Sequence, residues 1–145
     1  MTVDHLTGWW EAGVVAEVDK SEKITINVGL VDLGQIDLLV DEGFFANRTD
    51  FIRTAIRRQL ESRSDAVADT IARRTLTLGI QHLTRRDLEQ LRDASRTIEL
   101  RVLGLATIAD DVDAELALAT IASVEVLGAF RASRAVKAAL APRTT

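Results

Sequence analysis

One short strand with no evident partner most constrains what this sequence can fold into. In residues 23–28 apolar and polar side chains alternate strictly, so Ile24, Ile26 and Val28 share one face of an extended segment. A helical pattern begins soon after Gly29, and a lone strand leaves both of its hydrogen-bonding edges unpaired. The strand is therefore predicted to pair antiparallel with the same strand of a second chain, which makes the protein a homodimer.

A first helix is predicted directly after the strand. Asp32 followed by Gln35 is typical of a capping box at a helix start. Gly43 stands where a helix end favours a left-handed residue. The apolar residues recur at helical spacing, as Leu33, Ile36, Leu39 and Val40.

A second helix is predicted to begin at Asn47. Its side chain suits the cap position, and Asp50 places a carboxylate in the first turn, where the helix dipole favours it. The predicted inner face consists of Phe51, Ile52, Ala55, Ile56 and Leu60. Three basic residues lie mainly outside that face, namely Arg53, Arg57 and Arg58.

The polar face of the paired strands has the chemistry of a DNA-reading surface. A two-stranded ribbon fits the major groove of B-DNA. Lys23 can donate to guanine, Asn27 can pair with adenine, and Thr25 can bond a base edge or touch a thymine methyl. These three residues are the predicted base contacts.

The start of the second helix is suited to phosphate. Free N–H groups and the positive end of the helix dipole converge there. Arg48 and Thr49 add side-chain donors beside Asn47. These three residues are the predicted phosphate contacts, and they would set the position of the protein while the ribbon reads sequence.

In these features the chain resembles the ribbon-helix-helix transcriptional regulators of the CopG, Arc and MetJ type. The resemblance covers residues 21–61 and rests on the alternating strand, the Gly43-Phe44 turn and the helix start at residues 47–49. It implies obligate dimers, operator binding and, in most cases, repression. Two features depart from the usual pattern: residues 29–31 intervene after the strand, and an acidic segment precedes it.

Charge is distributed unevenly along the chain, whose net charge is −4. Residues 1–19 contain four acidic side chains and no Lys or Arg, so this arm alone carries −4. In the rest of the chain the number of Lys and Arg residues equals the number of Asp and Glu residues. The chain as a whole therefore lacks the excess of basic residues that DNA-binding proteins usually have. A DNA-facing patch must therefore arise by local sorting. The sequence leaves open whether the arm, which also carries Trp9 and Trp10, competes with DNA for that patch.

Composition excludes several classes of protein. With no Cys and only two His, thiolate metal sites, disulfides and His-based metal clusters are not expected. The acidic N-terminus lacks the basic region of a signal peptide, and no apolar run reaches the length of a membrane span. Neither a cofactor nor an enzyme active site is expected. The predicted location is the cytoplasm, in association with the nucleoid.

Three stretches in the C-terminal half align with one another. They begin at Leu78, Leu103 and Leu127, each starts Leu-Gly, and each has Leu at its fourteenth position. Repeats of this length suggest stacked units. Two structures satisfy the pattern: a small β-solenoid, or an αβ repeat with a strand at each Leu-Gly and a helix after it. In either case the region is strand-rich.

The sequence thus predicts an α+β protein in three parts. These are an acidic arm (residues 1–20), a ribbon-helix-helix DNA-binding domain (21–63) and a repeat or oligomerisation domain (72–141). The predicted function is a sequence-specific regulator, a repressor acting as a homodimer or higher oligomer on double-stranded DNA, with the C-terminal part free to bind a protein partner. Two alternatives are the antitoxin of a toxin–antitoxin pair and a polymer-forming structural repeat protein.

Overall fold

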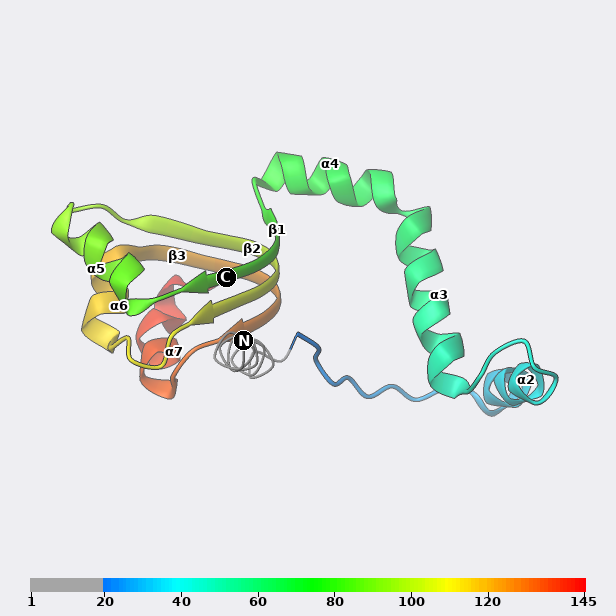
Figure 1. The fold of residues 1–145 in the computed structure, drawn as a ribbon. Coiled ribbons are helices and arrows are strands. Elements are labelled where there is room, and N and C mark those ends of the chain that lie inside the picture. Colours follow the sequence, from blue (N-terminus) through cyan, green and yellow to red (C-terminus); the bar gives the residue numbers. More distant parts are fainter. Residues whose placement is uncertain (1–19) are drawn as a thin grey trace, which may run out of the picture. The chain divides into compact units, whose positions relative to one another are not determined.

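The computed structural model describes residues 20–145 and combines helices with one three-stranded sheet, an α+β arrangement (Figure 1). The predicted arm therefore lies, except for Lys20, outside the described residues. The chain divides into two compact units. We call residues 25–78 the helical unit, and residues 79–145 with the chain up to Ile24 the sheet unit.

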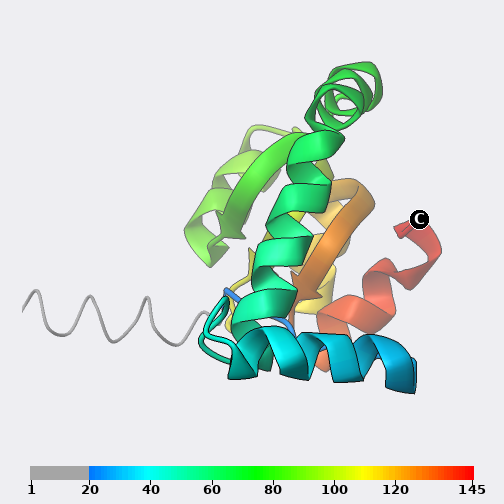
Figure 2. The ribbon, with the colours of Figure 1, turned by 90° about the vertical axis from the view of Figure 1, so that its right-hand side faces the viewer.

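The helical unit contains three helices, α2 (Leu30–Asp41), α3 (Arg48–Ser62) and α4 (Ser64–Arg74). Figure 2 shows α2 crossing the start of α3 at a steep angle. Gly43 has φ +85°, so the left-handed end predicted for the first helix is confirmed. The predicted capping box at Asp32 is wrong: α2 begins at Leu30 with Gly29 as its N-cap and no side-chain cap, and Asp32 lies inside the first turn.

The helical unit buries very little of its apolar surface in a single chain. Among its residues only Ile36 and Leu76 are buried, and neither α3 nor α4 has a buried residue. The apolar residues predicted to share one face of the first helix are the less exposed ones of α2: Ile36 is buried, and Leu33, Leu39 and Val40 are half-buried. Large apolar side chains stay exposed throughout this unit, including Ile26, Val28, Leu30, Val31, Leu38, Phe44, Ile56, Leu60 and Val67.

The sheet unit alternates strands and helices. Its elements are β1 (Thr77–Leu83), α5 (Arg85–Asp93), β2 (Ile98–Ile108), α6 (Ala114–Thr120), β3 (Ile121–Arg131), α7 (Arg134–Leu140) and the 3-10 helix η1 (Ala141–Arg143). Each Leu-Gly pair lies within a strand, and a helix follows each strand.

The three strands run in the same direction in the order β1-β2-β3. β2 and β3 pair in parallel, with Gly104 opposite Gly128. Between β1 and β2, Gly79 lies against Gly104 and His82 bonds Thr107. Both contacts join residues that are 25 positions apart in the sequence, 79 with 104 and 82 with 107. In antiparallel strands this separation would change along the pair, so β1 and β2 run parallel.

The core lies on one face of this sheet. It joins strand residues that share one face, such as Leu100, Val102 and Val124, to helix residues such as Leu88 of α5 and Val136 of α7. Leu116 and Ala117 bring α6 to the same cluster. With strand order β1-β2-β3 and right-handed crossovers, α5 and α6 must lie on the same side of the sheet. α7 joins them there, because its Val136 and Leu140 belong to the same core cluster. The other face receives no helix from residues 79–145.

Candidate nucleic-acid interface

The segment predicted to form the ribbon is extended and exposed. Residues 23–28 belong to no strand of the described chain. On the apolar side Ile24 is 74% and Ile26 62% exposed. On the polar side Lys23, Thr25 and Asn27 are all exposed. The apolar side chains are thus left without cover in a single chain, and the assignment of the polar three to base contact stays a prediction.

The start of α3 forms as predicted, with Asn47 as its N-cap. The Asn47 Oδ1 accepts a hydrogen bond from the Asp50 N–H at 2.8 Å, and the Asp50 carboxylate accepts from the Ala46 N–H at 3.0 Å. The predicted cap is therefore confirmed. Because Asn47 already uses its side-chain oxygen, the donors left for an anion are its amide group and the first-turn N–H groups of Arg48 and Thr49.

Arg48 makes a contact that sequence reasoning missed. Its Nε donates to Asp37 Oδ1 at 2.7 Å and its Nη2 to Asp37 Oδ2 at 2.8 Å, so the pair is bidentate. Both side chains are about half exposed, at 57% and 48%. Nη1 of Arg48 takes no part in this pair and can still donate to a phosphate. Asp37 therefore orients the guanidinium and also offsets its charge.

The Asp37–Arg48 pair gives a pH-dependent signature. Hydrogen bonds from the Arg48 guanidinium hold the pKa of Asp37 below its ordinary value. A lowered pKa means that the pair stabilises the fold above the ordinary carboxyl range and that this contribution is lost as pH falls through the lowered pKa. Because both groups are exposed, solvent screens the effect.

We expect the Arg48→Ala substitution to move the Asp37 pKa up to its ordinary value in an NMR titration of the carboxyl carbons, because the donors are removed. Asp87 is the internal control: its pKa is also lowered, but by hydrogen bonds from Thr84 at the start of α5. It should titrate identically in both proteins. An unchanged Asp37 titration would show that the pair does not form in solution.

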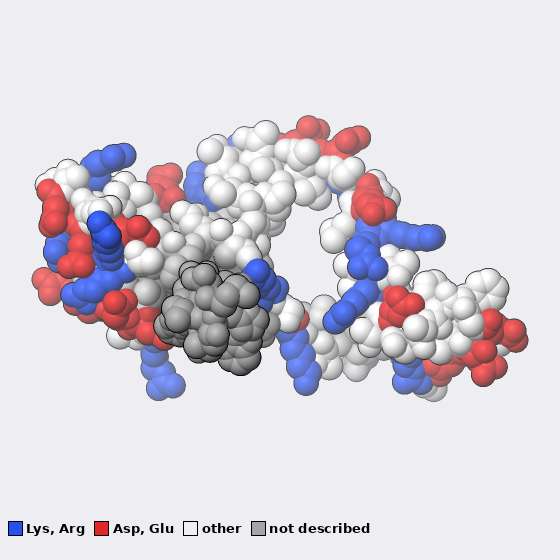
Figure 3. Space-filling view, viewed as in Figure 1, with Lys and Arg blue, Asp and Glu red and all other residues white. Residues whose placement is uncertain are grey.

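Basic side chains follow the exposed side of α3. Arg53, Arg57 and Arg58 are all exposed, as the helical pattern predicts. Figure 3 shows Lys and Arg side chains along this helix with acidic side chains between them. Phe45 and Phe51 meet edge to face with ring centroids 5.0 Å apart, and this contact ties the preceding turn to α3. The basic residues are therefore gathered on one helix, α3, although the chain as a whole has no excess of Lys and Arg.

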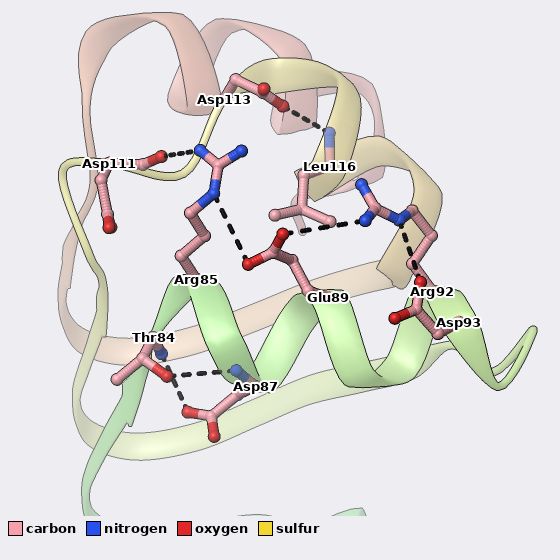
Figure 4. Close-up of polar contacts among 9 residues, drawn as sticks. All are labelled: Thr84, Arg85, Asp87, Glu89, Arg92, Asp93, Asp111, Asp113 and Leu116. Atoms are coloured by element: carbon pink, nitrogen blue, oxygen red, sulfur yellow. Dashed lines mark hydrogen bonds and ion pairs between the residues drawn. The ribbon is translucent and has the colours of Figure 1, made fainter.

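Polar contacts in the sheet unit are structural in kind (Figure 4). Thr84 and Asp87 form a reciprocal capping box at the start of α5. Arg85 donates from Nη1 to the backbone oxygen of Asp111 at 2.5 Å and lies 3.6 Å from a Glu89 carboxylate oxygen. The bond to Asp111 ties α5 to the loop before α6. Across residues 20–145 no three His, Asp or Glu side chains are grouped as metal ligands would be.

No helix within residues 20–145 combines the length and apolar character needed to cross a membrane.

Comparison with known families matches most of the chain. Residues 19–137 fit the model of the Ribbon-Helix-Helix transcriptional regulator family. The match extends well beyond residues 21–61, which carried the resemblance in the sequence, and includes nearly all of the sheet unit. Searches of curated proteins and of solved structures returned no match.

Proposed function

The chain belongs to the Ribbon-Helix-Helix transcriptional regulator family, a family of DNA-binding regulators, and we propose that it is a sequence-specific repressor that acts as a homodimer. Residues 23–28 of two chains would pair antiparallel into one ribbon. The polar side of the ribbon would enter the major groove, where Lys23, Thr25 and Asn27 meet base edges.

The observation that carries this proposal is the unburied apolar surface of the helical unit and of residues 23–24, which lead into it. A segment with Ile24, Ile26 and Val28 on one side, followed by two helices with almost no buried residue, has no core of its own. Exposed apolar surface this extensive is typical of an obligate interface. A second copy related by a two-fold axis would cover both ribbon strands and bring four helices around one core.

Phosphate binding follows from the start of α3. The N–H groups of Arg48 and Thr49 and the Arg48 Nη1 would donate to one phosphate on each side of the ribbon. Asn47 caps the helix through its side-chain oxygen, which accepts from the Asp50 N–H, and its amide group would be a further donor to the phosphate. Asp37 would hold the Arg48 guanidinium in place for that contact.

We also propose that the sheet unit consists of three copies of one strand–helix repeat. The proposal is supported by the parallel strands, whose Leu-Gly pairs at Leu103 and Leu127 stand opposite each other in register. Stacked strand–helix units can be extended or matched by a further copy. Self-association beyond the dimer and binding of a protein partner are the roles that such a unit would serve.

The DNA-binding proposal is tested by comparing Asn27→Ala with Arg48→Ala on the operator and on unrelated DNA. The operator is first located by genomic footprinting with the unmodified protein. Loss of a bidentate base contact should weaken operator binding by about 1–3 kcal/mol per contact and leave binding to unrelated DNA unchanged. Arg48→Ala should weaken binding to every sequence and lower the slope of affinity against salt by about 1.

Glu61→Ala provides a control at an exposed position of α3 outside the proposed contacts. It should bind both DNAs as the unmodified protein does or slightly more tightly, because it removes a negative charge. Operator binding that is equal in Asn27→Ala and the unmodified protein would contradict the base-contact assignment. If the affinity of the Arg48→Ala protein for DNA depended on salt as strongly as that of the unmodified protein, the assignment of Arg48 to phosphate contact would be contradicted.

A further inference from the structure

The last residue of β3 is bonded to the chain just before the ribbon segment. Nη2 of Arg131 donates to the Ser21 carbonyl oxygen at 3.2 Å and to Oε2 of Glu22 at 3.1 Å. These two acceptors lie 110 and 109 positions before Arg131 in the sequence. A residue of the sheet is therefore bonded to the two residues that directly precede Lys23, the first of the predicted base contacts.

The backbone that carries Arg131 is well supported by the sheet. Arg131 stands opposite Thr107 in the parallel pairing of β2 and β3. Thr107 is buried, and its side chain is hydrogen-bonded to His82 on β1, so all three strands support this position. The side chain of Arg131 is 33% exposed, whereas that of Glu22 is 63% exposed. The sheet is thus the fixed side of the contact, and the segment before the ribbon is the side that is held.

The contact fixes the chain close to where it enters the helical unit. That unit comprises residues 25–78, so it begins three residues after Glu22. At its other end the chain passes directly into β1, which begins at Thr77. The Arg131 contact therefore limits the freedom of the first ribbon residues. Ordering them in advance lowers the conformational entropy that is lost when the ribbon pairs with a second chain and binds DNA.

The contact lies away from the side of the ribbon that is proposed to meet DNA. In an extended chain, successive side chains point to opposite sides. Glu22 would therefore point to the same side as Ile24, opposite to Lys23. Arg131 can thus hold the segment without covering the side chains that are proposed to contact bases.

Charge gives the contact a second effect, which rests on the proposed DNA binding. In the proposed dimer Glu22 occurs twice, once beside the first residue of each ribbon strand. The major groove is about 12 Å wide and is bordered by phosphates, so a residue next to a base-reading side chain lies within about 10 Å of them. Charges still interact over about this distance at physiological salt. An unpaired Glu22 carboxylate would repel the DNA, and Arg131 offsets that repulsion.

We propose that Arg131 is a positioning residue for DNA binding, which holds the start of the ribbon through Ser21 and neutralises Glu22 beside the phosphates. The proposal rests on the proposed function but goes beyond it, since all the predicted DNA contacts lie within residues 23–49. It gives the sheet unit a part in DNA binding that does not require the sheet to touch DNA.

Digestion with trypsin, without DNA, measures how firmly the segment is held. Trypsin cleaves after Lys and Arg, and Lys20 and Lys23 flank the two held residues. Cleavage requires a segment to leave its folded conformation. We expect cleavage after Lys20 and Lys23, followed by mass spectrometry, to be several-fold faster in Arg131→Gln than in the unmodified protein. Glu22→Gln changes no residue of the sheet, and it should also speed cleavage.

Operator binding by four proteins measures the effect of charge: the unmodified protein, Arg131→Gln, Glu22→Gln and the double variant. An exposed ion pair contributes little, but a dimer contains two, so Arg131→Gln should lower operator affinity by about 2- to 30-fold. In the Glu22→Gln background the same substitution should lower affinity less, because no carboxylate is left to neutralise. Arg131→Lys keeps the charge and should restore most of the affinity.

Arg134→Gln is the matched control, because it removes the same charge at an exposed position three residues further along the chain, at the start of α7. It should leave both the cleavage rate and the operator affinity unchanged. Far-UV circular dichroism of every variant checks that the sheet unit is folded. If Arg131→Gln unfolds, Glu22→Gln and Arg131→Lys carry the test.

Two outcomes would overturn the proposal. Cleavage that is equally fast in the unmodified protein and in the variants of Arg131 and Glu22 would show that the contact does not hold the segment. An Arg131→Gln substitution that leaves operator affinity unchanged, or that lowers it equally in both Glu22 backgrounds, would show that Arg131 does not act through Glu22. Failure of the unmodified protein to bind any DNA would instead contradict the proposed function, and it is recognised without any variant.

Discussion

Replacing Ile26 with Asp is expected to abolish both dimerisation and DNA binding. In one chain Ile26 is 62% exposed, but in the proposed ribbon it lies in the core shared by two chains. The two-fold axis would place two unpaired carboxylates in that core, and an uncompensated buried charge costs several kcal/mol. Sedimentation equilibrium should show a monomer, circular dichroism should show loss of helix, and gel-shift assays should show no complex.

The neighbouring substitution Thr25→Asp is the matched control for this result. It introduces the same side chain one position away, on the opposite face of the ribbon. The dimer should persist because the new carboxylate is in water, while DNA binding should be lost because the carboxylates face phosphates and base acceptors. An Ile26→Asp protein that remains dimeric would place the dimer interface elsewhere.

Gly104→Ala is expected to destabilise the sheet unit by about 3 kcal/mol or more, through backbone strain and overpacking together. Gly104 has φ +138°, and a Cβ there would lie 2.2 Å from the Gly79 carbonyl oxygen. Gly128 repeats this situation, with φ +122° and a Cβ position 2.0 Å from the Gly104 carbonyl oxygen. The three strands thus approach each other along a line of glycines. Amide hydrogen exchange in β2 and β3 measures the effect within this unit.

Gly79→Ala separates the two causes. Gly79 has a similar φ of +125°, but a Cβ there would meet nothing within 4 Å. The Gly79→Ala substitution should therefore lower the free energy of unfolding only by the strain of the backbone conformation, about 1–2 kcal/mol. Equal losses for Gly79→Ala and Gly104→Ala would show that contact between strands is unimportant and that φ alone decides.

Features determined by neighbouring residues were predictable from the sequence. The Asn47 cap and the left-handed Gly43 each depend on a few adjacent positions, and both are confirmed. The cap predicted at Asp32 was wrong because the helix begins three residues earlier than that cap implies, at Leu30 with Gly29 as the N-cap. Local sequence patterns therefore predicted that these helices exist more accurately than they predicted the residue at which each helix begins.

Features that depend on distant parts of the chain were not predictable. The Asp37–Arg48 pair joins residues eleven positions apart on different helices, so it requires the crossing of α2 and α3 to be known. The strands expected at the three Leu-Gly pairs do form, as β1, β2 and β3. The sequence left open whether helices would follow the strands, because the three stretches differ in helix-forming residues.

In the proposed homodimer, the lack of a core in the helical unit of a single chain would make DNA-binding activity depend on the concentration of the protein. In the proposed homodimer this unit acquires its interior only from a second chain, so the population of its ordered form would rise with the square of the protomer concentration at low levels. The sheet unit, which has its own interior, gives the chain a persistent fold below that level. A cell that makes a little more of this regulator would therefore gain disproportionately more of its DNA-competent form, without any ligand.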